Sequence, residues 1–305
     1  MRSQSAMEYL ISYGWAIVLI AIVLVILVAY GAFSNNVGPR AQPGSCSVYH
    51  PYGAGISMGA QLEGVCSSEP PEYVANFEDV GSMEGGFIPL PNFNYTISIW
   101  FNVQAQSGLG CCTNPIFDVY NAFVNNGIGG GQNFDYASGF VTGQGFSLGE
   151  YWPTNWQFVE TGAISTGHWH NVIVTSSDYN TITIYIDGAK AAGPTLLSIS
   201  DPTVSQYLTT AAVSVGSNPP GGDELASTGT ELANLQVYGS VFSQNSVTSL
   251  YLRGIGGVPL NVQSLLGWWP LNGNTNDYSG SATALQPYAG GFSYSSSWTS
   301  GYTAP

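Results

Sequence analysis

The chain has 305 residues and a formal net charge of −14, with 4 Lys and Arg against 18 Asp and Glu. This balance excludes nucleic acid as a partner, because phosphate binding needs clustered basic residues. Charged residues make up only 7% of the chain, but its 8 Trp, 19 Tyr and 13 Phe exclude a disordered polypeptide. We expect a folded protein whose polar surface consists mainly of hydroxyl and amide groups.

The first 35 residues predict a membrane-spanning helix. No charged residue occurs between Glu8 and Arg40, and Ala16–Tyr30 is entirely apolar. A helix from Tyr9 to Phe33 would be about 37 Å long, which is enough to cross a bilayer. Secretory signals have a shorter apolar core of about 7–15 residues, usually after a clearly basic start. A single-pass anchor in the cell membrane is therefore the preferred interpretation, and a cleaved signal is the alternative.

The residues before the apolar run, Gln4-Ser5-Ala6-Met7-Glu8, resemble the start of archaeal type IV pilin-like proteins. In that family a membrane peptidase cuts before a Gln or similar residue, and the fifth residue of the mature chain is Glu. The resemblance implies cleavage between Ser3 and Gln4, and contact of Glu8 with the new amino terminus of a neighbouring subunit. There are two departures: Ser3 stands where Gly or Ala is usual, and the leader is short. In the alternative interpretation, Glu8 lies in the headgroup region, where the helix dipole favours a carboxylate.

Residues 36–72 are predicted to form a connector followed by a cysteine-bearing segment, since Asn, Gly and Pro residues end the helix. The chain has four cysteines: Cys46, Cys66, Cys111 and Cys112. If the bulk of the chain is extracellular, disulfides are expected. The preferred pair is Cys46–Cys66, which closes a moderate loop. A bridge between the adjacent Cys111 and Cys112 is strained, so crossed pairing is the alternative.

After Gly44 the pattern changes to short apolar alternations broken by Gly, Pro and Asn, which predicts a mostly antiparallel β fold. Tyr95–Phe101 alternates as a half-buried strand, and Thr181–Ile186 places three isoleucines on one face. Asp187-Gly188 follows at once and predicts a type I′ hairpin turn. One short helix is expected at Gln244–Arg253.

Several segments resemble the LamG-like, concanavalin A-like jelly roll. They are Tyr73–Phe77 with Phe87–Leu90 as an opening strand pair, Thr96–Phe101, Gly167–Val172 with Tyr185–Gly188, and Val213–Gly216 with Leu232–Tyr238. The resemblance implies an antiparallel jelly-roll sandwich over residues 73–260. Leu266–Gly280 resembles the stretch that normally precedes the first strands of this family. Residues 261–305 are therefore either the first hairpin of the family, moved to the end and packed on the sandwich, or a truncated repeat.

Glycan binding is one interpretation of the aromatic residues in this sandwich, and the alternative is that at least one of the tryptophans belongs to the core. Tyr151, Trp152 and Trp156 lie in a stretch with Pro and Asn, and exposed aromatic rings can stack on sugars. Hydrolysis of a glycosidic bond normally needs two flanking carboxyl groups. The glucanase relatives carry these carboxyl groups at alternate positions of one strand, and no such pattern occurs here. We therefore expect a binding protein rather than an enzyme, with an exported glycoside hydrolase as the less favoured alternative.

The remaining candidate sites are a glycosylation site and metal ligands. Asn94-Tyr95-Thr96 is the only N-x-[ST] sequence and is a candidate for glycosylation in an exported protein. His168 and His170 are two residues apart and could hold a metal, although packing is the favoured role for His170. LamG relatives sometimes bind Ca²⁺, but no ligands for it are assignable here, and no other cofactor is expected.

The sequence thus predicts residues 1–35 as a pilin-like membrane helix and the remainder as an extracellular head. The expected function is adhesion or recognition of a cell-surface glycan or protein, with membrane lipid and related pilin subunits as further partners. The alternative is an anchored carbohydrate-binding protein that does not assemble into filaments.

Overall fold

The computed structural model describes residues 14–23, 25, 40–77, 82–89, 94–104, 114–120, 135–142, 145–152, 155–177, 181–198, 210–218, 224–225, 229–288 and 298–305. The chain divides into two compact units, Met1–Pro39 and Arg40–Pro305. We call the second the sandwich unit and describe each unit by itself.

In the first unit, residues 14–23 and 25 are helical. Apolar side chains such as Trp15, Ile17 and Leu19 are exposed on this helix. Within the ranges given above, the structure has no helix both long and apolar enough to span a membrane. More than half of the expected span, residues 9–33, lies outside the described residues, as do Ser3, Gln4 and Glu8.

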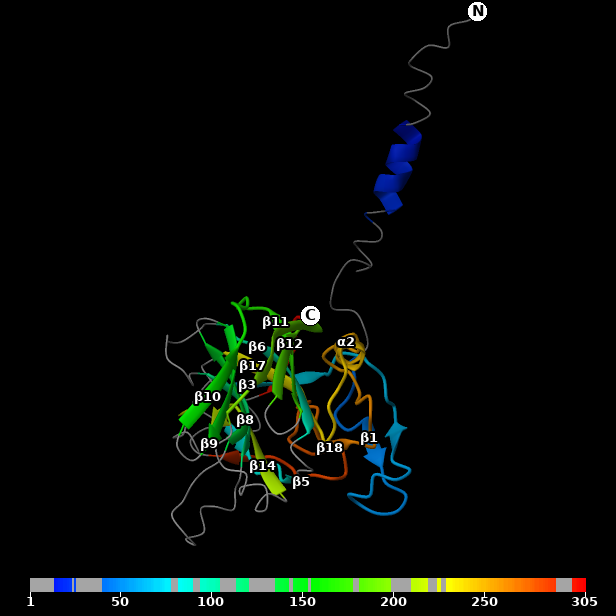
Figure 1. The fold of residues 1–305 in the computed structure, drawn as a ribbon. Helices are drawn as coiled ribbons and strands as arrows, with labels where there is room; N and C mark the ends of the chain where they lie inside the picture. The colour runs from blue at the N-terminus through cyan, green and yellow to red at the C-terminus, as the bar shows by residue number, and fades with distance from the viewer. Residues whose placement is uncertain are drawn as a thin grey trace, which may run out of the picture. The chain divides into compact units, whose positions relative to one another are not determined.

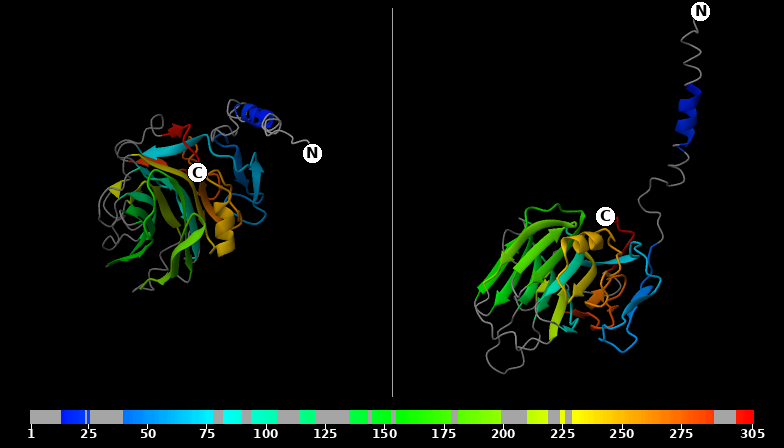
Figure 2. Two further views of the ribbon diagram at one scale, coloured as in Figure 1. Left: turned by 90° about the horizontal axis from the view of Figure 1, so that it is seen from above. Right: turned by 45° about the vertical axis from the view of Figure 1, so that its right-hand side comes forward.

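The described part of the sandwich unit contains two antiparallel eight-stranded sheets (Figures 1 and 2). The first, which we call the β9 sheet, has the order β10 (Asn155–Glu160), β9 (Gly145–Trp152), β8 (Asp135–Thr142), β7 (Pro115–Tyr120), β14 (Thr210–Val215), β4 (Ser82–Glu84) and β19 (Gln286–Tyr288), with β5 (Ile88–Pro89) also on β14. The second, which we call the β6 sheet, has the order β13 (Ala189–Leu196), β12 (Thr181–Ile186), β11 (Trp169–Ser177), β6 (Tyr95–Asn102), β17 (Thr230–Tyr238), β3 (Tyr73–Phe77) and β20 (Trp298–Ser300), with β18 (Leu265–Trp269) also on β17.

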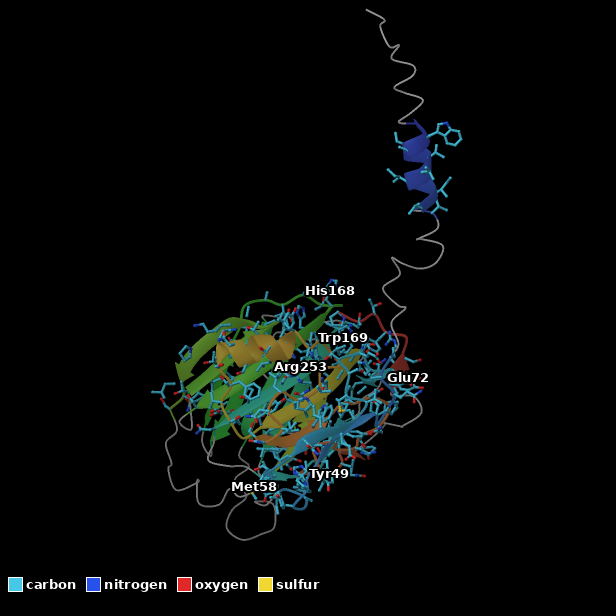
Figure 3. The ribbon with its side chains drawn as sticks, turned by 90° about the vertical axis from the view of Figure 1, so that its right-hand side faces the viewer. Tyr49, Met58, Glu72, His168, Trp169 and Arg253 are labelled. Carbon is cyan, nitrogen blue, oxygen red and sulfur yellow. A yellow bond between two sulfur atoms is a disulfide. The ribbon has the colours of Figure 1, made fainter. Side chains whose placement is uncertain are left out.

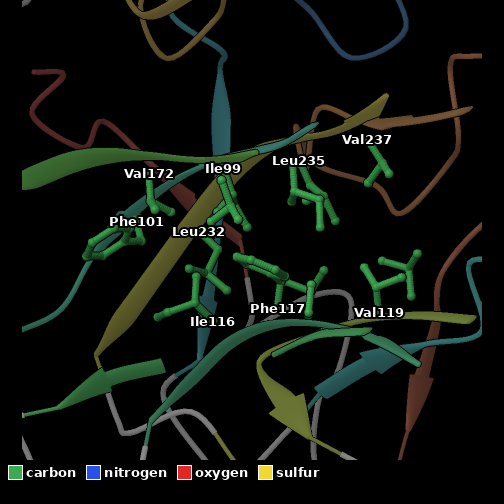
Figure 4. Close-up of a cluster of buried hydrophobic side chains, with 14 of the residues drawn as sticks. Ile99, Phe101, Ile116, Phe117, Val119, Val172, Leu232, Leu235 and Val237 are labelled. Atoms are coloured by element: carbon green, nitrogen blue, oxygen red, sulfur yellow. The ribbon is translucent and has the colours of Figure 1, made fainter. Parts of the chain in front are cut away.

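The hydrophobic core lies between the two sheets (Figure 4). Ile99 and Phe101 project from β6, and Leu235 from β17, towards Phe117 and Val119 of β7. These residues alternate along their strands because successive side chains of a strand point to opposite faces. The antiparallel sandwich predicted from the sequence is therefore confirmed.

The prediction that β6 is half-buried is wrong, because every residue from Tyr95 to Asn102 is buried. The outer face of the β6 sheet is covered by α2 (Gln244–Tyr251) and the segment that follows it. The ring of Trp100 stacks on Tyr251 of α2, with ring centroids 5.8 Å apart. Val247 and Leu250 of α2 belong to a second buried apolar cluster on this face. The sequence pattern predicted that one face of β6 is exposed to solvent, but this face is covered by a second layer of residues.

The type I′ turn predicted at Asp187-Gly188 is confirmed, since both residues have positive φ values of 51° and 77°. The predicted opening strand pair is not formed. Residues of β3 pair with β17 and β20 in the β6 sheet, whereas those of β5 pair with β14 in the opposite sheet. The two segments therefore lie on opposite sides of the core.

The C-terminal segment contributes strands to both sheets. β18 pairs with β17, β19 with β4, and β20 with β3. Trp268 packs in the cluster on the outer face of the β6 sheet, while Trp269 and Leu271 lie in the central core. This part of the chain is thus built into the sandwich.

The cysteine-bearing segment forms a small hairpin of β1 (Cys46–Tyr49) and β2 (Gln61–Gly64). A disulfide joins Cys46 to Cys66, with Cα atoms 4.8 Å apart, as the sequence predicted. The hairpin also carries the exposed side chains Tyr49 and Met58 (Figure 3). Cys111 and Cys112 lie outside the described residues.

Two further strands, β15 (Ser217–Asn218) and β16 (Glu224–Leu225), pair as a two-stranded sheet.

Candidate functional site

The outer face of the β9 sheet carries the aromatic group that the sequence singled out. In β10, Val159 packs in the core, so Trp156 and Phe158 project to the opposite face. In β8, Ala137 and Val141 pack in the core, which places Phe140 on that same outer face. Side chains from two strands of the sheet therefore meet on its outer side.

Trp156, Phe158 and Phe140 form one aromatic cluster, which we call the Trp156 platform. The rings of Trp156 and Phe158 are stacked, with centroids 5.5 Å apart and planes 10° from parallel. Phe140 meets Trp156 edge to face at 6.3 Å. Phe140 is fully buried, whereas Trp156 and Phe158 are half-buried. The cluster thus has a fixed base and two partly accessible rings.

The platform requires a glycine at position 149 of β9. Gly149 pairs with Phe158 across the two strands, and the rings lie over its backbone. A Cβ atom at this position would lie 2.7 Å from a ring carbon of Phe158 and 2.9 Å from one of Trp156. Both distances are shorter than real carbon contacts, so any larger residue would push the rings away from the sheet.

Polar side chains lie beside the platform on the outer face of the β9 sheet. Ser138 pairs with Gly149 on one side and with Asp118 on the other, and Ser214 pairs with Asp118. The hydroxyl of Ser138 donates a hydrogen bond to Asp118 Oδ1. All three of these polar side chains are buried. They form a buried polar row next to the aromatic rings.

Among the side chains of this sheet that the structure describes, two buried carboxyl groups, those of Asp118 and Glu150, lie on opposite faces. Asp118 is on the outer face, whereas Glu150 is two residues after the core residue Leu148 in β9 and therefore points inward on the same face as Leu148. There, the hydroxyl of Tyr95 donates to Glu150 Oε1 at 3.3 Å. Burial, and then the charge of Glu150, raise the pKa of Tyr95 well above its usual value. Asp118 and Glu150 therefore cannot flank one glycosidic bond as an acid and base pair.

Of the three aromatic residues named from the sequence, Trp156 lies in the platform. Tyr151 and Trp152 lie in β9, but their side chains are outside the described part of the structure. Sequence reasoning missed Phe158 and Phe140. Phe158 follows Trp156 at the period of a strand and was thus detectable, whereas Phe140 is brought there only by the pairing of β8 with β9.

His170 has the packing role that the sequence favoured. Its Nδ1 lies 2.7 Å from Asp187 Oδ2, and its Nε2 lies 2.8 Å from the Ser165 hydroxyl. The hydrogen bond to Asp187 raises the pKa of His170. His168 precedes β11 and is exposed, so it does not share a strand face with His170. Among the described residues, no group of His, Cys, Asp and Glu is arranged to hold a metal ion.

Asn94 directly precedes β6 and is half-buried. Its glycosylation stays a prediction.

Residues 82–248, which are more than half of the chain, match the Laminin G form of the concanavalin A-like lectin/glucanases superfamily. The chain belongs to this superfamily. No curated protein matches the sequence.

Three solved structures are partly similar to this chain. A heptameric SAP-like pentraxin from Limulus polyphemus has a TM-score of 0.42 and 17% identity, over 59% of this chain and 81% of that chain. A putative carbohydrate binding protein from Bacteroides ovatus has a TM-score of 0.44 and 16% identity, over 72% and 61%. The CBM40 domain of the Ruminococcus gnavus IT-sialidase, bound to α2,3-sialyllactose, has a TM-score of 0.38 and 14% identity, over 59% and 97%. All three TM-scores are below 0.5, so the assignment of this superfamily member rests on the match over residues 82–248.

Proposed function

We propose that this protein is a cell-surface glycan-binding protein, with the Trp156 platform as its binding site. The observation that carries the proposal is the stacked pair Trp156 and Phe158 on the outer face of the β9 sheet. Flat, partly exposed rings supply apolar contact area at low cost in conformational entropy. The superfamily includes both lectins and glucanases, and the separation of Asp118 from Glu150 favours binding over hydrolysis.

A glycan array with the full-length protein in detergent tests this proposal. Wild type should bind at least one class of glycan, and Trp156→Ala should lose that binding. Tyr52→Ala is the matched control, because Tyr52 is 62% exposed and lies in the disulfide-closed hairpin. Equal binding by wild type and Trp156→Ala, or no binding by wild type, would remove the support for the platform as a glycan site.

We further propose that residues 1–35 anchor the protein in the cell membrane, with the sandwich unit outside the cell. The described helical residues 14–23 and 25 are apolar on all sides, and such a helix needs an apolar environment. The Cys46–Cys66 disulfide favours an oxidising compartment for the sandwich unit. Extraction only by detergent, together with access of an impermeant thiol reagent to the reduced cysteines of whole cells, would support this arrangement.

The pilin-like interpretation is a separate proposal, which rests on the spacing from Gln4 to Glu8. The intact mass of the purified protein should lack Met1–Ser3 if a prepilin-type peptidase processes it. Glu8→Ala should then abolish filaments, because the carboxylate would lose its pairing with the amino terminus of a neighbouring subunit. Membrane insertion should be unchanged, because it depends on the apolar run. An intact start and the absence of filaments would instead indicate a simple anchored protein.

A further inference from the structure

A cavity lies on the outer side of the β6 sheet, whereas the Trp156 platform lies on the β9 sheet. Its volume is about 500 Å³, and its lining includes Asn102, Gln104, His168, Trp169, Glu231 and Tyr302. His168 and Trp169 mark this end of the sandwich unit in Figure 3, far from Tyr49 and Met58. A volume of this size falls in the range of about 300–1,000 Å³ that is typical of small-molecule sites.

The floor of this cavity is a row of residues paired across three strands. Asn102 of β6 pairs with Trp169 of β11 on one side and with Glu231 of β17 on the other. The side chains of Trp169 and Tyr302 pack edge to face at 5.8 Å and form an aromatic wall. The relative positions of Asn102, Trp169 and Glu231 are thus set by the pairing of three strands and do not depend on the conformation of a loop.

Glu231 is a half-buried carboxylate without a cationic partner in the described part of the chain. Its one hydrogen bond there comes from Asn102 Nδ2, which donates to Oε2 at 3.0 Å. Burial raises the pKa of the Glu231 carboxyl group. Arg40 lies nearby over the Tyr302 ring, but its guanidinium donates to the backbone oxygens of Pro71 and Tyr302. The charge of Glu231 is therefore not neutralised by this arginine.

The amide oxygen of Asn102 is a second unsatisfied acceptor in the same row. Asn102 is only 6% exposed, and its Oδ1 accepts no hydrogen bond from any described residue. Buried polar groups are normally paired, so an orphaned acceptor under a cavity points to a group that is supplied from outside the chain. Glu231 has a single side-chain donor, Asn102 Nδ2, and Asn102 Oδ1 has none among the described residues, so a group that donates hydrogen bonds would complete this row.

We propose that this cavity binds a small molecule through a protonated amino group. An ammonium group offers three N–H donors and no acceptor, which matches the carboxylate of Glu231 and the amide oxygen of Asn102. The net charge of −14 attracts cations to the whole molecule. The site does not depend on glycan binding at the Trp156 platform.

Calorimetry with two probes of the same shape tests the proposal on the full-length protein in detergent. Cyclohexylamine is protonated at neutral pH, whereas cyclohexanol is neutral. Wild type should bind the amine at least tenfold more tightly than the alcohol, and Trp156→Ala should keep this preference. Equal affinity for the two probes, or no binding of either, would overturn the proposal without bearing on the glycan site.

Two variants place the binding in this cavity. Glu231→Gln should lose the preference for the amine, whereas Glu160→Gln removes one exposed carboxylate from the other sheet and should keep it. Gln104→Glu adds a carboxylate at the exposed rim and should tighten amine binding, which tests the site even if Glu231→Gln does not fold. Amine binding that is unchanged in both Glu231→Gln and Gln104→Glu would overturn the assignment. Calcium binding that is lost in Glu231→Gln, without amine binding, would also overturn it and indicate a metal site.

Discussion

His170 Nδ1 lies 2.7 Å from Asp187 Oδ2, which joins β11 to the first residue of the tight turn between β12 and β13. The other oxygen of Asp187 accepts a hydrogen bond from the backbone N–H of Asn171 at 2.8 Å. Asp187 also has a positive φ of 51°, which few residues other than Gly, Asn and Asp adopt readily. The turn is therefore held by its own conformation and by two contacts with the neighbouring strand.

This pair predicts a pH dependence of stability. The pKa of His170 is raised by the hydrogen bond to Asp187, so folding favours the protonated imidazole. The stabilisation is fully present below the unfolded pKa of about 6.5 and is lost as the pH rises through the higher folded pKa. His170→Gln should lower the free energy of unfolding by about 1 kcal/mol more at pH 5.5 than at pH 9. Urea unfolding at both pH values measures this difference.

His168→Gln is the control for that experiment, because His168 is exposed and precedes the strand. Its effect should be the same at both pH values. If His170→Gln and His168→Gln behave alike, the pair with Asp187 does not contribute to stability.

The packing at Gly149 predicts that a single methyl group disturbs the Trp156 platform. Gly149→Ala would bring its Cβ to 2.7 Å from the Phe158 ring, so the rings must move. We expect a loss of about 1–3 kcal/mol in stability, as for other overpacked sites, and weaker retention on any glycan that wild type binds. Gly162→Ala is the matched control, since nothing lies within 4 Å of its Cβ position. A fully active Gly149→Ala variant would contradict the platform as the binding surface.

The disulfide between Cys46 and Cys66 predicts a measurable loss when it is removed. The closed loop has a sequence separation of 20 residues. Cross-links of this kind contribute about 2–4 kcal/mol, mainly by restricting the unfolded chain. The double variant Cys46→Ser with Cys66→Ser should therefore melt at a lower temperature than wild type. Dithiothreitol should lower the melting temperature of wild type by a similar amount. If the untreated double variant melts like untreated wild type, and dithiothreitol lowers the melting temperature of both by the same amount, the effect belongs to Cys111 and Cys112.

The burial of Trp269 predicts that the C-terminal segment is needed for the fold. This side chain is fully buried in the central core, and its Nε1 donates to the Thr283 backbone oxygen at 3.1 Å. Trp269→Ala should cost about 3–5 kcal/mol. Tyr52→Ala, at an exposed position, should stay within about 0.5 kcal/mol of wild type. A mild effect of Trp269→Ala in thermal unfolding would mean that this segment packs only loosely on the sandwich.

The local pattern of the sequence was sufficient for several elements. The alternation of Ile182 and Ile184 marked β12, and Asp187-Gly188 marked the turn after it, because side-chain period and turn chemistry depend on neighbouring residues. The resemblance to LamG domains added the antiparallel sandwich. The pair Cys46–Cys66 was preferred because it closes a moderate loop, and the structure contains this disulfide.

Only the tertiary structure decided which distant residues share a face. Asn102 and Glu231 are 129 residues apart, and the pairing of β6 with β17 brings them together. Trp100 fits a half-buried strand by pattern, yet it is buried because Tyr251 of α2 packs on it. Phe140 reaches the platform through the pairing of β8 with β9. Strand order, and the layers that cover a sheet, depend on contacts between residues far apart in the sequence. A periodicity of two residues describes only neighbouring residues and does not specify these contacts.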